Sequence, residues 1–347
     1  EAEKINGIAF FDDSHTFIKT GSRDRVRDID SIALPAWDLT PLSEYLDRGF
    51  GWGVNRGRSM PMLASRGCPY QCTFCSNPSM WTTRWVIRDP DLLLDEMEES
   101  IREYGVTNFD FYDLTFVINK QWILNFCRKI EERGLKITWQ LPSGTRSEVI
   151  DSEVSKLLYS SGCRNLSYSP ESGSESVLNR IKKKIKLEPF IDSIRHSREK
   201  GLNIKCNIIL GFPGETLKEV LDSFKFIVRM AIAGAHDLNI WSYSPYPGSE
   251  LFDDLMASGR LKLDNAYFDS LRSYSDASNT TSFCENFTDR ELKQLRFAGR
   301  CLFYLVSWSC RPIRPFRMIR NIKRGTHESR MEMGLANIIR RKWFYSN

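Results

Sequence analysis

Apolar and polar positions alternate along residues 60–245 in a way that predicts repeated strand–helix units. Short runs rich in β-branched and aromatic residues are separated by stretches in which apolar residues recur every three or four positions. This order is typical of a parallel sheet whose strands are joined by helices. The six expected strands are MPMLASRG, FDFYDLTF, KITWQLP, NLSYSPE, NIKCNIILGFP and DLNIWSYSPYPG. The pattern therefore predicts an α/β fold.

The first predicted helix has clear signals at both ends. Asp89 can accept hydrogen bonds from the free N–H groups of a first turn, and Pro90 suits the position after such a cap. Gly105 suits the left-handed position that ends a helix. A second helix is expected between Asn119 and Gly134. We place the core at residues 58–262 and expect a mainly helical, basic extension at 263–347.

Length and composition limit the classes of protein to which the chain can belong. The chain has 347 residues, 41% of them hydrophobic, which is enough for one large domain. No apolar run approaches the roughly 18 residues of a membrane span, and the start, EAEKINGIAF, lacks the features of a signal peptide. Five of the nine cysteines lie in apolar or helical segments: Cys127, Cys163, Cys206, Cys301 and Cys310. We expect a soluble, cytoplasmic protein with reduced thiols, and a chain that begins within a longer protein.

Positive charge is concentrated at the carboxyl end. The net charge is +5, whereas residues 311–347 carry ten Arg or Lys and two Glu, a local charge of +8. Pro312 and Pro315 argue against a regular helix at the start of this segment. We expect a solvated basic face, with peripheral contact to anionic lipid headgroups as the alternative. No RNA-binding module accompanies these residues, so no nucleic-acid partner is expected.

The segment RGCPYQCTFCSNP places three cysteines, Cys68, Cys72 and Cys75, in one loop after a predicted strand. Three thiolates at these spacings can hold one side of a metal cluster and leave a fourth position open. A structural zinc site is the alternative, but such sites usually close with four ligands. No second CxxC pair or nearby His completes this one. An iron–sulfur cluster with one open iron is therefore the favoured interpretation.

The cysteine motif, with Phe74 directly before its last member, resembles the signature of radical S-adenosylmethionine (SAM) enzymes. The resemblance implies a 4Fe-4S cluster whose open iron binds SAM, and reductive cleavage of SAM to a 5′-deoxyadenosyl radical. It implies a reductant such as flavodoxin or ferredoxin. It also implies a partial TIM-like barrel of six βα units, which agrees with the strands predicted from the pattern.

Further segments resemble the subgroup that joins this barrel to an N-terminal cobalamin-binding domain, which includes the anaerobic cyclase of bacteriochlorophyll synthesis and cobalamin-dependent methyltransferases. These segments are INGIAFFDD, DIDSIALPAWDLTPL, SPESGSESVLNRIKK, NIILGFPGET and YSPYPGSELF. The resemblance implies that residues 1–57 are a linker from a cobalamin domain upstream of this chain. It implies methyl transfer or a related step at an unactivated carbon of a small-molecule or lipid-like substrate.

Polar residues after successive strands are candidates for holding SAM, because the loops at the carboxyl ends of barrel strands carry the chemistry. The resemblance places Asp113 near the SAM amino group, Arg146 near its carboxylate and Glu171 near its ribose hydroxyls. Lys183 and Asn207 complete the set. For each single residue, a solvated charge or a salt bridge at the barrel rim is the alternative.

Two other features are interpreted as structural. The GFPGET segment lacks the Lys of a Walker motif, so we expect a tight turn near the adenine of SAM instead of a phosphate-binding loop. The histidines show no metal-binding spacing, and we assign all four to packing or solvent: His15, His196, His236 and His327. We therefore assign neither a nucleotide phosphate nor a histidine-bound metal to this chain.

Two alternatives to cobalamin-dependent methylation stay open. One is radical SAM cyclisation or rearrangement without cobalamin. The other is a non-catalytic module in which the cysteines hold zinc or an iron–sulfur cluster as a staple. Metal analysis after anaerobic reconstitution separates a zinc staple from the enzymes, because the staple would hold about one zinc per chain.

Overall fold

The computed structural model describes residues 1–274 and 279–344. Contacts along the chain divide it into two units, Glu1–Leu34 and Pro35–Asn347. The first unit contains a hairpin in which β1 (Ala9–Phe11) pairs with antiparallel β2 (Phe17–Lys19). It also contains 3-10 helices at Ala2–Lys4 and Ile29–Ser31. The boundaries that we expect at residues 57 and 262 stay predictions.

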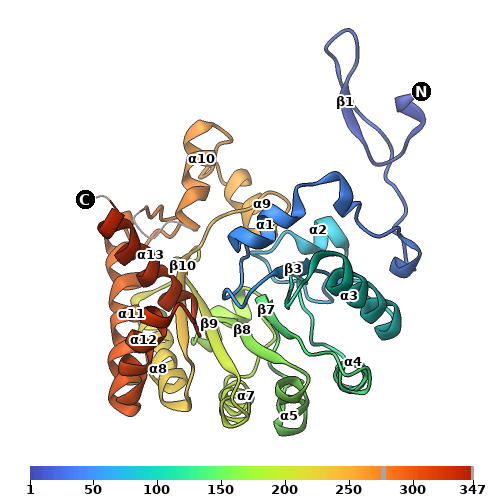
Figure 1. The fold of residues 1–347 in the computed structure, drawn as a ribbon. Helices are drawn as coiled ribbons and strands as arrows, with labels where there is room; N and C mark the ends of the chain where they lie inside the picture. Colours follow the sequence, from blue (N-terminus) through green and yellow to red (C-terminus); the bar gives the residue numbers. More distant parts are fainter. Residues whose placement is uncertain (275–278, 345–347) are drawn as a thin grey trace. The chain divides into compact units, whose positions relative to one another are not determined.

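A six-stranded sheet forms the centre of the second unit (Figure 1). The strand order is β10-β9-β8-β7-β6-β3, and every pairing is parallel. The strands are β3 (Ser59–Met62), β6 (Asn108–Phe111), β7 (Thr138–Thr145), β8 (Cys163–Glu171), β9 (Asn203–Leu210) and β10 (Asp237–Ser242). The predicted α/β fold with six parallel strands is confirmed, and the sheet is open between β3 and β10.

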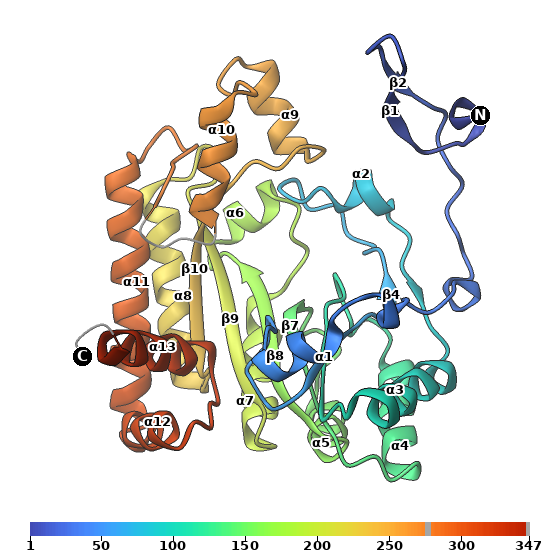
Figure 2. The same ribbon diagram turned by 45° about the horizontal axis from the view of Figure 1, so that its top comes forward.

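Helices join successive strands and cover the outer face of the sheet (Figures 1 and 2). The helices of this layer are α3 (Pro90–Tyr104), α4 (Lys120–Glu132), α5 (Ser152–Ser160), α7 (Leu187–Glu199) and α8 (Leu217–Ala233). The predicted signals of α3 are confirmed, since the Asp89 side chain accepts from the first-turn N–H groups and Gly105 is left-handed. Leu93 and Met97 of α3 are fully buried against the sheet, so one apolar face holds this helix in place.

Shorter elements form the loops and the segment that precedes the sheet. They are the 3-10 helices Trp37–Leu39 and Leu271–Tyr274, α1 (Leu42–Arg48), β4 (Ser65–Arg66), α2 (Asn77–Trp81), β5 (Val86–Ile87), α6 (Glu175–Arg180), α9 (Glu250–Ala257) and α10 (Asn265–Ser270). β4 and β5 pair in antiparallel fashion on either side of the cysteine segment. This small ribbon therefore holds the two ends of that loop together.

Three helices follow the barrel: α11 (Asp289–Cys310), α12 (Ile313–Arg324) and α13 (Arg330–Phe344). α11 packs on α8 and β10 and confirms the helix expected there. The expectation of no regular helix near Pro312 and Pro315 is wrong, because α12 begins at Ile313. Pro315 lies in the first turn, where a backbone N–H has no partner within the helix and its loss costs little.

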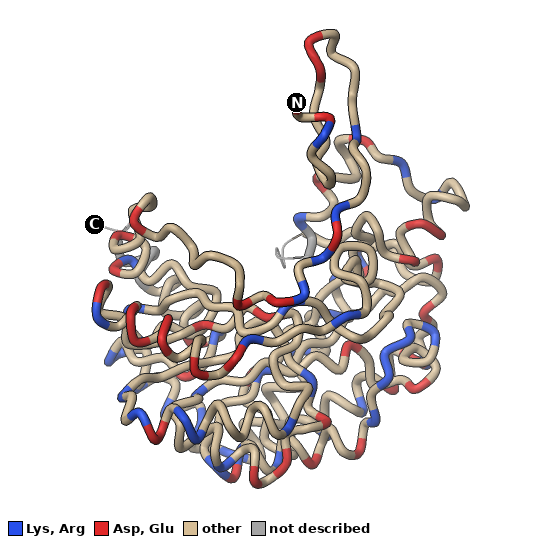
Figure 3. The backbone as a smooth tube through the Cα atoms, turned by 90° about the vertical axis from the view of Figure 1, so that its right-hand side faces the viewer, with Lys and Arg blue, Asp and Glu red and all other residues tan. Residues whose placement is uncertain are grey.

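Arg311, Arg314 and Arg317, in the basic segment that follows α11, have structural partners. Arg311 donates to the carbonyl oxygens of Ala231 and Ile232 at 3.0 and 2.8 Å, and Arg314 donates to those of Gly234 and Ala235 at 2.8 and 2.7 Å. These carbonyls lie at the end of α8, where cations and donors are favoured. Arg317 forms an ion pair with Glu328 at 2.9 Å. Figure 3 shows Lys and Arg interspersed with Asp and Glu over the outer helices.

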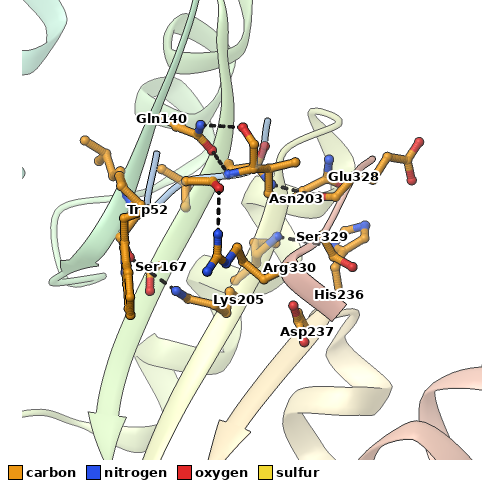
Figure 4. Close-up of a pocket in the computed structure, with 17 residues that line it drawn as sticks. Trp52, Gln140, Ser167, Asn203, Lys205, His236, Asp237, Glu328, Ser329 and Arg330 are labelled. Carbon is orange, nitrogen blue, oxygen red and sulfur yellow. Dashed lines mark hydrogen bonds between the residues drawn. The ribbon is translucent and has the colours of Figure 1, made fainter. Parts of the chain in front are cut away.

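Two segments far apart in the chain close the amino-terminal end of the barrel (Figure 4). Residues 52–56 come before β3, and residues 328–333 comprise the end of the link from α12 and the first turn of α13. Three hydrogen bonds tie the first segment to the strands: Gly53 N–H donates to Asp110 (3.3 Å), Val54 N–H to Gln140 (3.0 Å) and Arg56 to Asn165 (2.8 Å). Two tie the second segment: Asn165 donates to the carbonyl oxygen of Glu328 (2.9 Å), and Met331 N–H donates to Asp237 (3.2 Å). We call these two segments the barrel floor.

All nine cysteines are free thiols. Of those expected to pack in apolar segments, Cys127, Cys163 and Cys206 are buried, whereas Cys301 and Cys310 are exposed on α11. Among the helices of residues 1–274 and 279–344, none is long and apolar enough to cross a membrane.

Candidate active site

The cysteine loop follows β4 and is fixed at several points. Gly67 has φ +84°, and a Cβ there would collide with the carbonyl oxygen of Arg84, so only glycine fits. The Thr73 N–H donates to Ile181 O at 3.1 Å, and Thr73 O accepts from the Leu251 N–H at 2.9 Å. These bonds tie the middle of the loop to the ends of two other barrel loops.

The three thiols of the loop share one electrostatic environment. Burial raises the pKa of Cys68, Cys72 and Cys75, whereas the positive charge of Lys183 lowers each of them. Bound iron requires thiolates, so a nearby cation favours the ligating form. Within the described part of the chain, no three His, Cys, Asp or Glu side chains converge closely enough to hold one metal ion. Three thiolates in one loop can each bind a different iron of a cluster, which is the arrangement that the cysteine spacing predicts.

Glu171 and Lys183 form a buried ion pair beside this loop. The Lys183 Nζ lies 3.0 Å from a Glu171 carboxylate oxygen, and the two side chains are only 9–10% exposed. Glu171 ends β8 with φ +69°, an uncommon backbone conformation for a residue other than glycine. Burial raises the pKa of the Glu171 carboxyl, and Lys183 opposes that rise. The pair therefore places compensated charge next to the thiols.

Arg146 follows β7 and is fully engaged by neighbouring groups. Its guanidinium lies 3.7 Å from the ring centroid of Tyr70, which belongs to the cysteine loop. It also donates to the Glu148 carboxylate at 2.8 Å and to the Lys184 carbonyl oxygen. These contacts connect the loops after β4, β7 and α6, so in this structure Arg146 joins loops to each other at the barrel mouth.

Asp113, like Arg146 and Lys183, does not line the cavity described below. Its carboxylate accepts hydrogen bonds from the Ala64 N–H at 3.2 Å and from the Ser65 hydroxyl. The side chain is almost fully buried, and this burial raises its pKa to about 6. Asp113 thus holds the strand that leads into the cysteine loop.

A cavity of about 420 Å³ adjoins the cysteine loop and extends into the barrel. Glu171, Asn207, Phe74 and Cys75 all line it, so four of the predicted site residues meet in one space. Asn207 lies on β9 and donates to the hydroxyls of Ser167 and Ser169 at 2.9 and 3.1 Å. The other lining residues are Trp52, Ser76, Asn77, Met80, Trp81, Leu114, Pro142, Ser143, Ser169, Lys205, Ile209, Trp241, Ser242, Tyr243, Ser244 and Tyr246. Its size is that of an ordinary ligand site.

Sequence reasoning missed the aromatic wall of this cavity and Lys205. Lys205 and Asn207 are two residues apart on β9 and therefore point to the same side of the sheet. This spacing is visible in NIKCNIIL and is the signal that points to Lys205. Trp52 had no such signal, because it reaches the cavity from the barrel floor.

The GFPGET segment forms the tight turn that we expect. The Glu215 carboxylate accepts from the Gly211 N–H at 2.6 Å and from the Phe212 N–H at 3.3 Å. Phe212 packs on Phe74 of the cysteine loop, with ring centroids 5.7 Å apart. The Nδ1 atom of His236 accepts from the Ile204 N–H at 3.2 Å, which is a packing role. Proximity of the turn to adenine stays a prediction.

Comparison with known proteins identifies the domain that carries this site. Residues 62–227 match the model of the radical SAM superfamily. An uncharacterised methyltransferase of Pyrococcus horikoshii is 29% identical over 283 residues, which are 82% of this chain and 58% of that protein. The anaerobic magnesium-protoporphyrin IX monomethyl ester cyclase of Cereibacter sphaeroides is 31% identical over 255 residues, which are 73% of this chain and 40% of the cyclase.

A solved structure shares the fold over nearly all of the chain. The cobalamin-dependent S-adenosylmethionine radical enzyme OxsB, with aqua-cobalamin and S-adenosylmethionine bound, aligns with a TM-score of 0.65 at 16% identity. The alignment covers 99% of this chain and 52% of OxsB. The chain thus spans about half the length of the proteins that it matches.

Proposed function

Since residues 62–227 of this chain are a radical SAM domain, we propose that the chain is the catalytic core of an enzyme that cleaves SAM reductively at a 4Fe-4S cluster. Cys68, Cys72 and Cys75 would hold the cluster and leave one iron for SAM. When bound, such a cluster would supply one electron for the reductive cleavage of SAM, which would provide the radical that abstracts hydrogen from the substrate. The observation that carries the proposal is one loop with three free thiols, Cys68, Cys72 and Cys75, the last of which lines a cavity that extends into a parallel barrel.

The residues around the thiols fit this group. Burial raises the pKa of all three thiols, and the Lys183 cation opposes this rise, which favours the ligating thiolates. Glu171 lines the cavity, and we propose that its carboxylate accepts hydrogen bonds from the ribose hydroxyls of SAM. Asn207 and Phe74 line the same space, and Arg146 holds the loops around it. For Asp113 we propose a positioning role, because its hydrogen bonds go to the strand before the cysteine loop.

We propose that the whole protein transfers a methyl group with the help of cobalamin. The support is the methyltransferase and cyclase names of the relatives, together with a matching fold in a cobalamin-dependent radical enzyme. In this proposal residues 1–57 lead from an upstream cobalamin domain. A cobalamin-independent cyclisation or rearrangement is the second candidate; the cyclase name of one relative supports ring formation and carries no information on cobalamin. Product analysis separates them: methyl transfer yields S-adenosylhomocysteine and 5′-deoxyadenosine together, whereas the second candidate yields no S-adenosylhomocysteine.

The partners and the location are also proposals. The electron donor would be a flavodoxin or a ferredoxin, the substrate a small or lipid-like molecule, and the compartment the cytoplasm. A peripheral lipid contact would use exposed apolar side chains of α12, namely Ile313, Phe316 and Ile319, beside its basic residues. Cosedimentation with anionic vesicles should then fall as salt rises. Absent or salt-independent binding would leave a solvated face.

Anaerobic reconstitution with iron and sulfide tests the cluster. The parent chain should hold about four irons, and the Cys72→Ala variant should hold fewer and release no 5′-deoxyadenosine from SAM. Cys301→Ala is the matched control, because Cys301 is a free, exposed thiol on α11 and should change neither value. A Cys72→Ala variant that releases 5′-deoxyadenosine at the parent rate would show that the cluster assignment is wrong. Binding of about one zinc per chain would favour the staple.

A further inference from the structure

The inner end of the cavity carries a lysine that the proposed cluster and SAM site do not use. Lys205 extends from β9 into the barrel, on the same side of the sheet as Asn207 and Ile209. The residues between them, Cys206 and Ile208, face the other side and are fully buried. Lys205 also lines a smaller cavity of about 30 Å³ that reaches the barrel floor (Figure 4). It therefore lies at the boundary between the large cavity and the floor.

Lys205 has no carboxylate partner in the described part of the chain. Its Nζ donates to the carbonyl oxygen of Pro142 at 3.2 Å, and it belongs to none of the ion pairs found there. Asp237 is the acid whose charge acts on it, but that carboxylate already has its own donors. They are the Leu238 N–H at 2.9 Å, the Tyr304 hydroxyl at 2.5 Å and the Met331 N–H at 3.2 Å. The ammonium group therefore has no carboxylate in ion-pair contact, and Asp237 on the neighbouring strand acts on it only through space.

Among the residues that the structure describes, the remaining walls of the cavity carry no charged side chain besides Glu171, and they mix aromatic and apolar residues with neutral polar ones such as Asn77 and Ser143. Glu171 is neutralised by Lys183. Aromatic rings supply much of the rest of the lining: Trp52, Phe74, Trp81, Trp241, Tyr243 and Tyr246. Such a lining suits an aromatic or apolar body, and a single buried cation suits one anionic group on it. Because burial of an uncompensated ion is costly, an anion beside Lys205 would be bound strongly.

We propose that Lys205 binds a carboxylate or phosphate group of the substrate, whose apolar or aromatic body occupies the cavity between Lys205 and the cysteine loop. The term substrate rests on the proposed function, whereas the anion site itself rests on the cavity and on the unpaired ammonium group.

The protonation of Lys205 agrees with an anion site. Burial lowers its pKa to about 8, and Arg330 adds to this effect while Asp237 opposes it. The other titratable groups of the cavity are Cys75, Glu171, Tyr243 and Tyr246, and the pKa of each is raised. Lys205 is thus charged at neutral pH, and a bound anion would raise its pKa. Affinity for an anion should fall as the pH rises above about 8.

Two fluorescent probes of the same shape test the site in the chain as it stands, without cluster or SAM. 1-Anilinonaphthalene-8-sulfonate carries a permanent anion, and N-phenyl-1-naphthylamine is its neutral counterpart. The Lys205→Met variant should bind the sulfonate about tenfold more weakly, since one charge-assisted hydrogen bond is lost, and should bind the neutral probe within about twofold of the parent. Lys136→Met, which alters an exposed lysine before β7, should change neither affinity.

The pH series and competing ligands complete the test. The affinity of the parent for the sulfonate should fall between pH 7 and pH 9, and that of Lys205→Met should stay constant. Competition by 1-naphthoate or by 1-naphthyl phosphate identifies the preferred anion, and failure of both to compete would overturn the proposal. Unchanged sulfonate affinity in Lys205→Met, or an equal loss for both probes, would also overturn it.

Iron content after reconstitution shows whether a negative result refutes the anion site or the proposed function. Lys205→Met should hold as many irons as the parent, because all three thiols remain. Normal iron content with unchanged probe binding would refute the anion site alone. Absence of the cluster in the parent would refute the proposed function and leave the probe result valid.

Discussion

Replacing Lys183 by Met tests the buried ion pair beside the cysteine loop. The substitution keeps the length and the apolar stem of the side chain but removes the cation that lies 3.0 Å from the Glu171 carboxylate. Glu171 then stays buried as an uncompensated charge. We expect a large loss in the free energy of unfolding, because breaking a buried pair on one side costs more than the pair contributes as a whole.

The magnitude follows from the geometry. At 3.0 Å and an effective dielectric constant of about 20, the attraction between the two charges is about 5.5 kcal/mol. Desolvation of two side chains that are only 9–10% exposed costs several kcal/mol for each ion and cancels most of this attraction. Lys183→Met removes the attraction and leaves the desolvation cost of Glu171, so we expect a loss of about 3 kcal/mol. Lys183→Met combined with Glu171→Gln should recover most of it.

Urea unfolding followed by circular dichroism measures this loss. With a slope of about 3 kcal/mol per molar urea, the midpoint should fall by about 1 M at pH 8. Without Lys183, the already raised pKa of Glu171 rises further, so its protonation at pH 5.5 should restore part of the stability. Lys182→Met is the matched control, because Lys182 pairs with Glu250 at an exposed site and should change the midpoint little.

Two outcomes would contradict this reasoning. If Lys183→Met cost no more than Lys182→Met, water would solvate the pair and the desolvation argument would not apply. If the loss were equal at pH 8 and pH 5.5, the ionised Glu171 carboxyl would not be its source.

Two further substitutions test structural roles. Arg314→Met should lower the free energy of unfolding by about 2 kcal/mol, because it removes the hydrogen bonds to Gly234 O and Ala235 O. The control is Arg320→Met on the exposed face of α12, which should have no measurable effect in a thermal melt. Burial raises the pKa of Asp113 from 3.8 to about 6, so its contribution to stability is present at acid pH and is lost as the pH rises through 6. As the pH rises from 4 to 7, the free energy of unfolding of Asp113→Asn should therefore increase by about 2–3 kcal/mol relative to that of the parent, measured by urea titration. A difference between variant and parent that stays constant over this range would show that Asp113 does not ionise there.

The strands and the first helices could be predicted because their signals are local. Alternation in NIKCNIIL and the cap formed by Asp89 and Pro90 depend on neighbours within one turn or one strand. The start of α12 was mispredicted because a proline breaks a helix only in its interior, and Pro315 lies in the first turn. The barrel floor was not predicted, since contacts such as that of Asn55 with Met333 join residues 278 positions apart.

In the site, too, the features that depend on neighbouring residues could be predicted and those that depend on distant residues could not. Cys68, Cys72 and Cys75 form a local motif, so their joint position follows from the spacing alone. The cation of Lys183 reaches these thiols from the loop after α6. Asp113 has the right place in the chain, after β6, but its side chain turns to Ala64 and Ser65. The direction of a single side chain depends on which buried donors surround it, and sequence position does not encode that.

The position of Lys205 sets a scale for the substrate. Successive residues of a strand rise by about 3.3 Å, so Asn207 lies about 7 Å and Ile209 about 13 Å from Lys205 along β9. The cysteine loop adjoins the end of the cavity to which Asn207 and Ile209 lead, and Cys75 and Phe74 belong to its lining. In the proposed enzyme, hydrogen abstraction would occur near that loop, because its three cysteines would hold the cluster that binds SAM. An anionic group at Lys205 therefore requires a body that separates it from the reacting carbon by about 10 Å, which excludes small acids such as acetate or pyruvate as substrates.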